Sequence, residues 1–470
     1  MNPAPMKPAP VDSAVFRARR SRLSKEIGSG LIVLLGNDEV GMNYAANTYH
    51  FRQDSTFLYF FAVEQPGLAA IIDADEGEET LFGDDLTVAD IVWTGPQPTI
   101  ADQCKPAGIA SSAPTAKLEE RVTAAIKQGR RVHFLAPYRP EHTLKLARLL
   151  GIAPGMVASY RSEALHRAIV AQRSIKSAEE VADIEFAVGV SREMYLAAMA
   201  AAKPGSYEYE VVAEIVRVAY GRGCGLSFPI ICSVHGETLH NHYHGNQIET
   251  GDVLVVDSGV ETPHKNASDI TRSFPVGGKF GTRQRNIYEM VLRAQLAAIA
   301  AIKPGVSYRD VHLLVARSFA TDLKAAGLMK GDVDEAVSAG AHALFFPHGL
   351  GHMLGMDVHD MENIGEEYVG YGPGVERSTQ FGLAYLRLAR ALQPGFVLTV
   401  EPGLYFIPAL IDQWKAEKHL EQFINYAEVE KYRDMRGYRI EDDVLVTASG
   451  SKVLGPPIPK TVQEIEAATS

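Results

Sequence analysis

Three histidines lie within the sixteen residues FFPHGLGHMLGMDVHD, which run from Phe345 to Asp360. His348 and His352 are four residues apart, a spacing that can place two side chains on one face of a helix, but the glycines around them are poor helix formers. We therefore expect extended or looping backbone that another group approaches closely, and not a helical zinc site. The alternative for each histidine is a hydrogen-bonded core residue without a chemical role.

Four carboxylates elsewhere in the chain lie at the ends of expected strands. The segments GDVLVVD and GFVLTVE each reach an acid, Asp257 or Glu401, six residues after a glycine. Strand side chains alternate between two faces, so Asp257 shares a face with Val253 and Val255, and Glu401 shares one with Val397 and Thr399. Asp269 follows twelve residues after Asp257, where a strand pair joined by a loop can bring the two together. Glu441, in the segment YRIEDDVLV, lies just before another apolar, strand-like run.

Four carboxylates in apolar surroundings are costly to bury unless a cation compensates their charge. Two divalent ions balance four negative charges and leave one neutral imidazole as a fifth ligand. Carboxylates with a single histidine and no thiolate favour Mn²⁺, with Co²⁺, Fe²⁺ or Zn²⁺ as alternatives. Because two such metal ions side by side activate water and polarise a carbonyl, the predicted chemistry is hydrolysis.

The second half of the chain repeats a pattern. AAKPGSYEYEVV at 201–212 resembles AIKPGVSYRDVH at 301–312, and the two strands that carry Asp257 and Glu401 resemble each other. The repeats predict two similar half-domains, each delivering an acid into a common centre. Chance similarity in a valine-rich chain is the alternative.

The first 170 residues mix strand and helix patterns. Apolar runs at 31–35, 55–63 and 67–72 follow one another at a spacing typical of hairpins, and we expect the first to be a buried strand. Helical periodicity covers 116–127 and 141–150, with a strand near 132–136 between them. This pattern predicts a compact α/β domain.

A helix start marks the domain boundary. Ser177, followed by Glu180, forms a capping box in front of a long helical run that stops at Lys203-Pro204-Gly205. We therefore predict an N-terminal domain over 1–172 and a second domain over 173–470.

The bulk properties narrow the class of protein. A chain of 470 residues with a net charge of -11 fits two soluble domains and argues against nucleic-acid binding. Cys104, Cys224 and Cys232 are too few and too scattered for a disulfide framework, which favours a reducing compartment. No secretory signal or membrane-length apolar run is evident, so we expect a cytoplasmic protein. The proline-rich stretch Met1–Pro10 is predicted to be a disordered lead.

Five segments resemble one known family. VVDSG, SDITRSF, PHGLGHMLGMDVHD, LTVEPGLYF and RIEDD, in this order, resemble the signature segments of the prolidase and aminopeptidase P group of proline-specific metallopeptidases. FRQDSTFLYFFAVEQPGLAAIID also resembles the start of that group's N-terminal domain. The resemblance covers nearly the whole chain. It implies an α+β fold, in which a C-terminal pita-bread catalytic domain with an internal pseudo-twofold repeat follows a smaller, creatinase-like α/β domain.

The resemblance also implies the ligands of a dinuclear metal centre. Asp269 and Glu441 would bridge both ions, Asp257 would chelate one, and His352 with Glu401 would complete the other. Glu401 is in addition the implied proton shuttle.

Further residues acquire substrate roles from the same resemblance. His359 matches a histidine that contacts substrate and stabilises the tetrahedral intermediate, and His240 matches one that lines the substrate pocket. His348 becomes a supporting residue beside the substrate. Arg439 would hold the acidic cluster or the substrate terminus, with a purely structural salt bridge to buried carboxylates as the alternative. Arg387 matches the arginine that binds the terminal carboxylate in prolidases, a contact that favours dipeptides; a solvated helix arginine is the alternative. The implied catalytic residues are therefore His240, His359, Glu401 and Arg439.

This sequence departs from the family pattern at a few points. The loop between the first two acids is one residue longer than usual, and Phe228 stands where many relatives have a tyrosine. His242 or His244 could replace His240 in register. The long stretch 409–436 resembles prolidases more than the shorter bacterial aminopeptidase P chains.

We expect a hydrolase that uses two Mn²⁺ ions to cleave the Xaa-Pro bond of dipeptides. The alternative is an Xaa-Pro aminopeptidase that acts on longer peptides, and more remote alternatives are a metal-free enzyme of the creatinase kind or a non-catalytic interaction module. The expected partners are small peptides with proline as second residue and a second copy in a homodimer, without nucleic acid or membrane. Activity on organophosphate esters stays open.

Overall fold

The computed structural model describes residue 8 and residues 10–470, which divide into two compact units. One unit comprises Pro10–Arg173 together with the short segment Asn363–Tyr368. The other contains Ser174–Glu362 and Val369–Ser470. Apart from residues 8 and 10, the predicted disordered lead lies outside the described residues.

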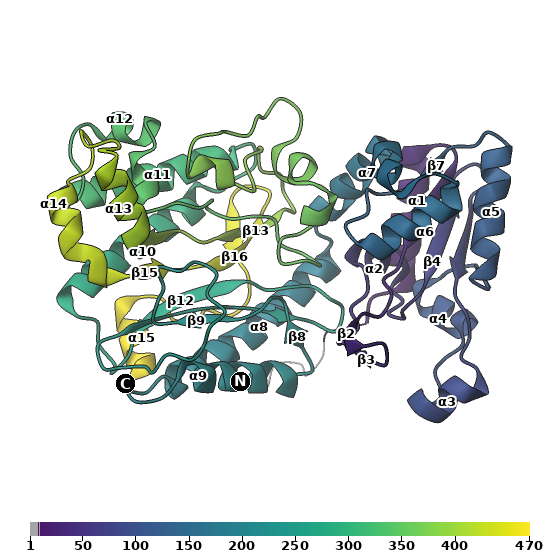
Figure 1. The fold of residues 1–470 in the computed structure, drawn as a ribbon, viewed down its shortest axis with the longest axis horizontal. Helices are drawn as coiled ribbons and strands as arrows, with labels where there is room; N and C mark the ends of the chain where they lie inside the picture. Colours follow the sequence, from purple (N-terminus) through teal and green to yellow (C-terminus); the bar gives the residue numbers. More distant parts are fainter. Residues whose placement is uncertain (1–7, 9) are drawn as a thin grey trace. The chain divides into compact units, whose positions relative to one another are not determined.

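A five-stranded mixed sheet organises the N-terminal unit (Figure 1). Its order is β6-β5-β4-β1-β7, in which β1 pairs antiparallel with β4 and parallel with β7. Leu31 and Val33 of β1 pack in one buried cluster with Val122 of α5 and Leu146 of α6. The predicted helices at 116–127 and 141–150 are thereby confirmed as α5 and α6. The unit contains β1 (Leu31–Leu35), β2 (Gly41–Tyr44), β3 (Asn47–Thr48), β4 (Ala69–Asp73), β5 (Glu78–Phe82), β6 (Ser111–Ala113), β7 (Val132–His133), α1 (Ser13–Ile27), α2 (Ser55–Phe61), α3 (Val88–Thr94), α4 (Ile100–Ala107), α5 (Ala116–Lys127), α6 (Pro140–Leu150) and most of α7 (Glu163–Ser174).

The apolar run at 55–63 is a helix, so the expected hairpin-like strand there was wrong. Asp54 caps α2 by accepting a hydrogen bond from the Phe57 backbone amide at 2.8 Å. All seven residues of α2 are buried, and a helix that is apolar on every side has no helical periodicity in its sequence. The capping aspartate was the signal that could have distinguished it from a strand.

The larger unit is built from two similar halves. In the first half, helices α8 (Ala178–Ala201) and α9 (Glu208–Gly221) precede the strand pair β10 (Val253–Ser258) and β12 (Ile270–Pro275). In the second half, helices α10 (Thr282–Ala301) and α11 (Tyr308–Ala325) precede the strand pair β13 (Val397–Val400) and β16 (Asp442–Val446). Figure 1 shows the first helix pair along the lower edge of this unit and the second towards its upper edge, with the strands between them. The predicted repeat of element order is therefore present in the structure.

The capping box at the start of α8 is confirmed. The Ser177 side chain accepts from the Glu180 amide, and the Glu180 carboxylate accepts from the Ser177 amide. Lys176, just before it, forms a buried ion pair of 2.7 Å with Asp360, which fixes the end of the histidine-rich segment. Removal of one partner from such a buried pair is strongly destabilising, so this contact anchors the segment firmly.

The remaining elements of this unit complete its sheets, which include the two-stranded pairs β11-β8 and β14-β15, and its outer helices. Three strands form the order β12-β10-β9 and three form β13-β16-β17. No helix among the described residues combines the length and the apolar character needed to cross a bilayer. These elements are β8 (Gly225–Leu226), β9 (Ile231–Ser233), β11 (Val260–Glu261), α10 (Thr282–Ala301), α11 (Tyr308–Ala325), α12 (Val333–Ser338), β13 (Val397–Val400), β14 (Gly403–Tyr405), α13 (Pro408–Ala416), α14 (Tyr426–Val429), β15 (Gly437–Arg439), β16 (Asp442–Val446), β17 (Ser451–Val453) and α15 (Val462–Thr469).

Candidate active site

The first two carboxylates come from one antiparallel strand pair. Asp257 lies within β10 and is paired with Thr271 of β12, and Asp269 directly precedes β12. The last rung of the ladder joins Ser258 to Ile270, so the chain leaves and re-enters the sheet between the two acids. The longer loop between them contains β11 and a left-handed residue, Lys265, with φ 67°. The predicted pair of strands joined by a loop is thereby confirmed.

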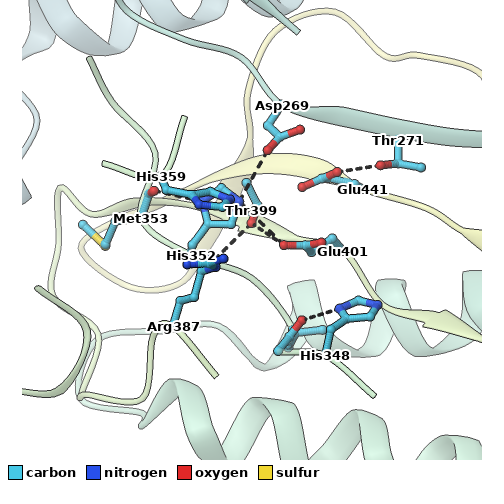
Figure 2. A network of polar contacts seen from close by, with 12 residues as sticks. Asp269, Thr271, His348, His352, Met353, His359, Arg387, Thr399, Glu401 and Glu441 are labelled. Atoms are coloured by element: carbon cyan, nitrogen blue, oxygen red, sulfur yellow. Dashed lines mark hydrogen bonds and ion pairs between the residues drawn. The ribbon is translucent and has the colours of Figure 1, made fainter. Parts of the chain in front are cut away.

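The other two carboxylates come from the equivalent pair in the second half. Glu401 directly follows β13 and Glu441 directly precedes β16, and the rung next to them joins Val400 to Asp442. An isolated bridge between Thr271 and Glu441 connects the two halves. The Thr271 hydroxyl also donates to Glu441 Oε2 at 2.7 Å (Figure 2).

The backbone of His352 is held by two hydrogen bonds to Thr399 of β13, one to its hydroxyl and one to its amide. Its amide donates to Thr399 Oγ1 at 3.1 Å, and its carbonyl accepts from the Thr399 amide at 3.0 Å. Gly351 makes this approach possible, because a Cβ there would lie 2.1 Å from the Thr399 carbonyl oxygen. As predicted, the backbone around His348 and His352 is not helical.

The His352 ring is oriented for its Nε2 atom to act as a ligand. Its Nδ1 atom is 3.0 Å from the Met353 carbonyl oxygen, which can only accept, so the proton lies on Nδ1. Nε2 lies 3.4 Å from Asp269 Oδ2 and 3.6 Å from Glu401 Oε1 (Figure 2). Asp269, His352 and Glu441 each present a ligand atom within 4.8 Å of the others.

The electrostatics of this cluster favour a cation. Burial, together with the neighbouring carboxylates, raises the pKa values of Asp269 and Glu441 well above their usual range. Burial also raises the pKa of Glu401 to about 7. The pKa of His352 is well below its usual value because burial disfavours the charged ring. The protein thus offers a neutral imidazole among acids that repel one another, an arrangement that divalent cations stabilise.

Unused carboxylate oxygens give a second test of whether a metal fits. Asp257 Oδ1, Asp269 Oδ1 and Glu441 Oε1 are buried and accept no hydrogen bond from any described residue. Buried polar atoms nearly always have a partner, so these oxygens are suited to ligate a metal. Oxygen donors with one imidazole match the preferences of Mn²⁺ and related divalent ions. The residues present therefore fit a metal centre.

Arg439 is buried beside the acids. It forms an ion pair with Asp257, donates to Tyr405 Oη at 2.7 Å and donates to Thr271 Oγ1 at 3.1 Å. Of the two roles open at the sequence level, these contacts match the salt bridge that holds buried carboxylates. Tyr405 Oη also lies 3.0 Å from His348 Nε2. Burial lowers the pKa of His348 to about 3, so this ring is neutral.

One cavity of about 590 Å³ collects the predicted residues. This volume lies within the range of small-molecule sites. Apolar side chains, including Phe228 and Phe381, form part of its wall. All ten predicted site residues line it: His240, Asp257, Asp269, His348, His352, His359, Arg387, Glu401, Arg439 and Glu441.

The loop with three closely spaced histidines contributes two of them to the cavity. His240 and His242 both line it, whereas His244 Nε2 lies 3.0 Å from the Ile230 carbonyl oxygen and His244 is absent from the lining. Of the three histidines considered for the substrate pocket, His240 and His242 therefore both remain candidates. Burial lowers the pKa of His240, which favours its neutral form.

His359 and Arg387 share a carboxylate partner that sequence reasoning missed. Glu362 Oε2 lies 2.5 Å from His359 Nδ1, and Glu362 Oε1 forms an ion pair with Arg387. These contacts, the His359 hydrogen bond foremost, lower the pKa of Glu362 to about 2. Arg387 lies in non-helical backbone, so the alternative of a helix arginine was wrong. The only feature of the sequence that could have pointed to Glu362 is that it follows His359 by three residues.

Comparisons with known proteins agree with this geometry. Residues 182–448 match the model of metallopeptidase family M24, and residues 16–133 match the aminopeptidase P N-terminal domain. The chain is 35% identical to the Xaa-Pro dipeptidase of Homo sapiens, over 97% of this chain and 93% of that protein. It is 30% identical to a probable Xaa-Pro aminopeptidase of Penicillium rubens, over 97% of each. Among solved structures, proline aminopeptidase P II from Yersinia pestis superimposes with a TM-score of 0.81 at 28% identity, covering 98% of this chain and 99% of that one.

Fold, cavity and comparisons define the class of protein as a metal-dependent peptidase. The chain belongs to metallopeptidase family M24. The predicted fold, an α+β pita-bread catalytic domain after a smaller α/β domain, is thereby confirmed, as is the prediction of an enzyme.

Proposed function

We propose that this metallopeptidase hydrolyses the peptide bond that precedes proline. The observation that carries the proposal is that the predicted ligands and the predicted substrate residues line one cavity. Similarity over almost the whole chain to Xaa-Pro dipeptidases and to Xaa-Pro aminopeptidases supports it. The predicted substrates are small peptides with proline as second residue.

We propose that Asp257, Asp269, His352, Glu401 and Glu441 hold two divalent metal ions, with Mn²⁺ preferred. The buried oxygens without a hydrogen-bond partner and the neutral imidazole support this ligand set. When bound, such ions lower the pKa of water and polarise the scissile carbonyl.

The chain's own residues then position the substrate and move the proton. Glu401 takes a proton from the attacking water and delivers it to the proline nitrogen as the bond breaks. His359 donates from Nδ1 to Glu362, so it can also donate from Nε2 to the developing oxyanion only when that second ring nitrogen carries a proton as well. His240 contacts the substrate from the cavity wall. Arg439 keeps Asp257 in place through their ion pair.

We propose that dipeptides are preferred, because Arg387 lines the cavity and can bind a terminal carboxylate through charged hydrogen bonds. The alternative, removal of an N-terminal residue from longer peptides, is favoured by the similarity to aminopeptidase P structures. The homodimer and the cytoplasmic location stay predictions from the resemblance and the composition.

Hydrolysis of Gly-Pro and Ala-Pro, compared with Arg-Pro-Pro in the presence of Mn²⁺, tests the substrate class. We expect kcat/KM to be higher for the two dipeptides, because only in them does the proline that directly follows the scissile bond carry the terminal carboxylate that Arg387 would bind. Amino-acid analysis of the products measures both rates. Faster cleavage of Arg-Pro-Pro would assign the aminopeptidase activity instead.

A further inference from the structure

The carboxylate of Glu362 connects two side chains of the substrate cavity. One oxygen lies 2.5 Å from His359 Nδ1 and the other pairs with Arg387 Nη1. Both partners line the cavity, and Figure 2 shows Arg387 extending towards His352 and His359. Glu362 therefore touches the residue proposed for the oxyanion and the residue proposed for the substrate carboxylate.

Its contact with His359 orients the ring. A carboxylate at Nδ1 requires a proton there, which fixes the tautomer of the neutral ring. The rings of His352 and His359 lie 4.1 Å apart between centroids, at 61° to each other, so the orientation of one constrains the other. Glu362 is in this respect a positioning residue for His359.

Its contact with Arg387 has a different consequence. A guanidinium binds a carboxylate through a planar fork of donors, and Glu362 already supplies a carboxylate to that fork. The carboxylate of a substrate presents the same chemistry to the same group. It must therefore displace Glu362 from Arg387 or share the guanidinium with it.

We propose that Glu362 competes with the substrate's terminal carboxylate for Arg387 and thereby weakens the preference for dipeptides. The side chain of Glu362 is 39% exposed and that of Arg387 is 34% exposed, so water reaches the ion pair. Replacing Glu362 by a substrate carboxylate at Arg387 therefore costs little free energy. The inference rests on the proposed role of Arg387 in binding the carboxylate of Xaa-Pro substrates.

The test compares Glu362→Gln with the wild-type protein on Gly-Pro and on Gly-Pro amide, both with Mn²⁺ present. Glutamine keeps a hydrogen-bond acceptor for His359 but removes the charge that competes at Arg387. We expect KM for Gly-Pro to fall about two- to fivefold, the range for an exposed ion pair, while KM for the amide does not fall. An equal change for both substrates, or no change for either, would overturn the proposal.

Glu428→Gln is the matched control, because Glu428 is 40% exposed, pairs with Lys431 and does not line the cavity. It should leave both KM values unchanged. Calorimetric binding of L-proline and prolinamide to the metal-loaded variant adds a measurement that needs no turnover: only the affinity for L-proline should rise. Wild-type protein that cleaves neither peptide would reject the proposed function, whereas normal wild-type cleavage without the Glu362→Gln effect would reject this inference alone.

Discussion

A Glu401→Gln variant is expected to fold and to lose about 10²- to 10⁴-fold of the wild-type kcat for Ala-Pro, the contribution typical of a general acid–base group. Glutamine has the shape of glutamate but cannot take a proton from water or pass it to the proline nitrogen. Glu401 follows β13 directly, and its Oε1 atom is 3.6 Å from His352 Nε2. Initial rates at saturating substrate and Mn²⁺ measure the loss.

Metal analysis of the same variant separates the two roles proposed for Glu401. A lower metal content identifies the ligand role, and a lower kcat at full metal content identifies the proton role. Glu180→Gln is a suitable control, because Glu180 is a buried capping carboxylate of α8 outside the cavity. A Glu401→Gln protein with wild-type kcat would mean that the centre has been assigned wrongly.

Replacement of Arg387 by methionine is expected to lower kcat/KM for Gly-Pro by about 10- to 100-fold, the value of one charged hydrogen-bonded contact. Methionine preserves much of the apolar stem and removes the guanidinium. Because Gly-Pro amide has no terminal carboxylate, its kcat/KM should change by less than about twofold on the same reasoning. Steady-state kinetics on the two substrates give both ratios.

An exposed arginine of α11 offers the control for this substitution. Arg317 pairs with Asp334 and does not line the cavity, so Arg317→Met should leave both substrates unaffected. Equal losses on Gly-Pro and on its amide after Arg387→Met would show that Arg387 supports the cavity wall and does not bind the carboxylate.

The sequence was sufficient to locate the acids because their placement depends on local rules. Strand alternation and the glycine-to-acid spacing put Asp257 and Glu401 at equivalent points of two strand pairs, and the ladders of the structure agree. Charge compensation then predicts a cation among them, whatever the conformations of the loops. Burial raises the pKa values of Asp269 and Glu441 for that same reason.

The sequence was insufficient where long-range contacts decide the structure. The run at 55–63 gives no helical periodicity, because α2 is buried on all sides and only its cap distinguishes it from a strand. The partnership of Glu362 with Arg387 joins residues 25 positions apart across a segment without α-helix or strand, in which only short 3-10 and π turns occur. Loop conformation of this kind follows from packing against the rest of the unit and has no periodic signature.

The central claim is that five residues hold two metal ions that cleave the bond before proline. Its most direct measurement is the release of proline from Ala-Pro by chelator-treated protein as Mn²⁺ is added back, with bound metal determined by elemental analysis. We expect no release from the stripped protein, full activity once two equivalents of Mn²⁺ are bound per chain, and no cleavage of Ala-Gly. Protein that binds both equivalents and cleaves the bond before proline in neither Ala-Pro nor a longer Xaa-Pro peptide would contradict the claim.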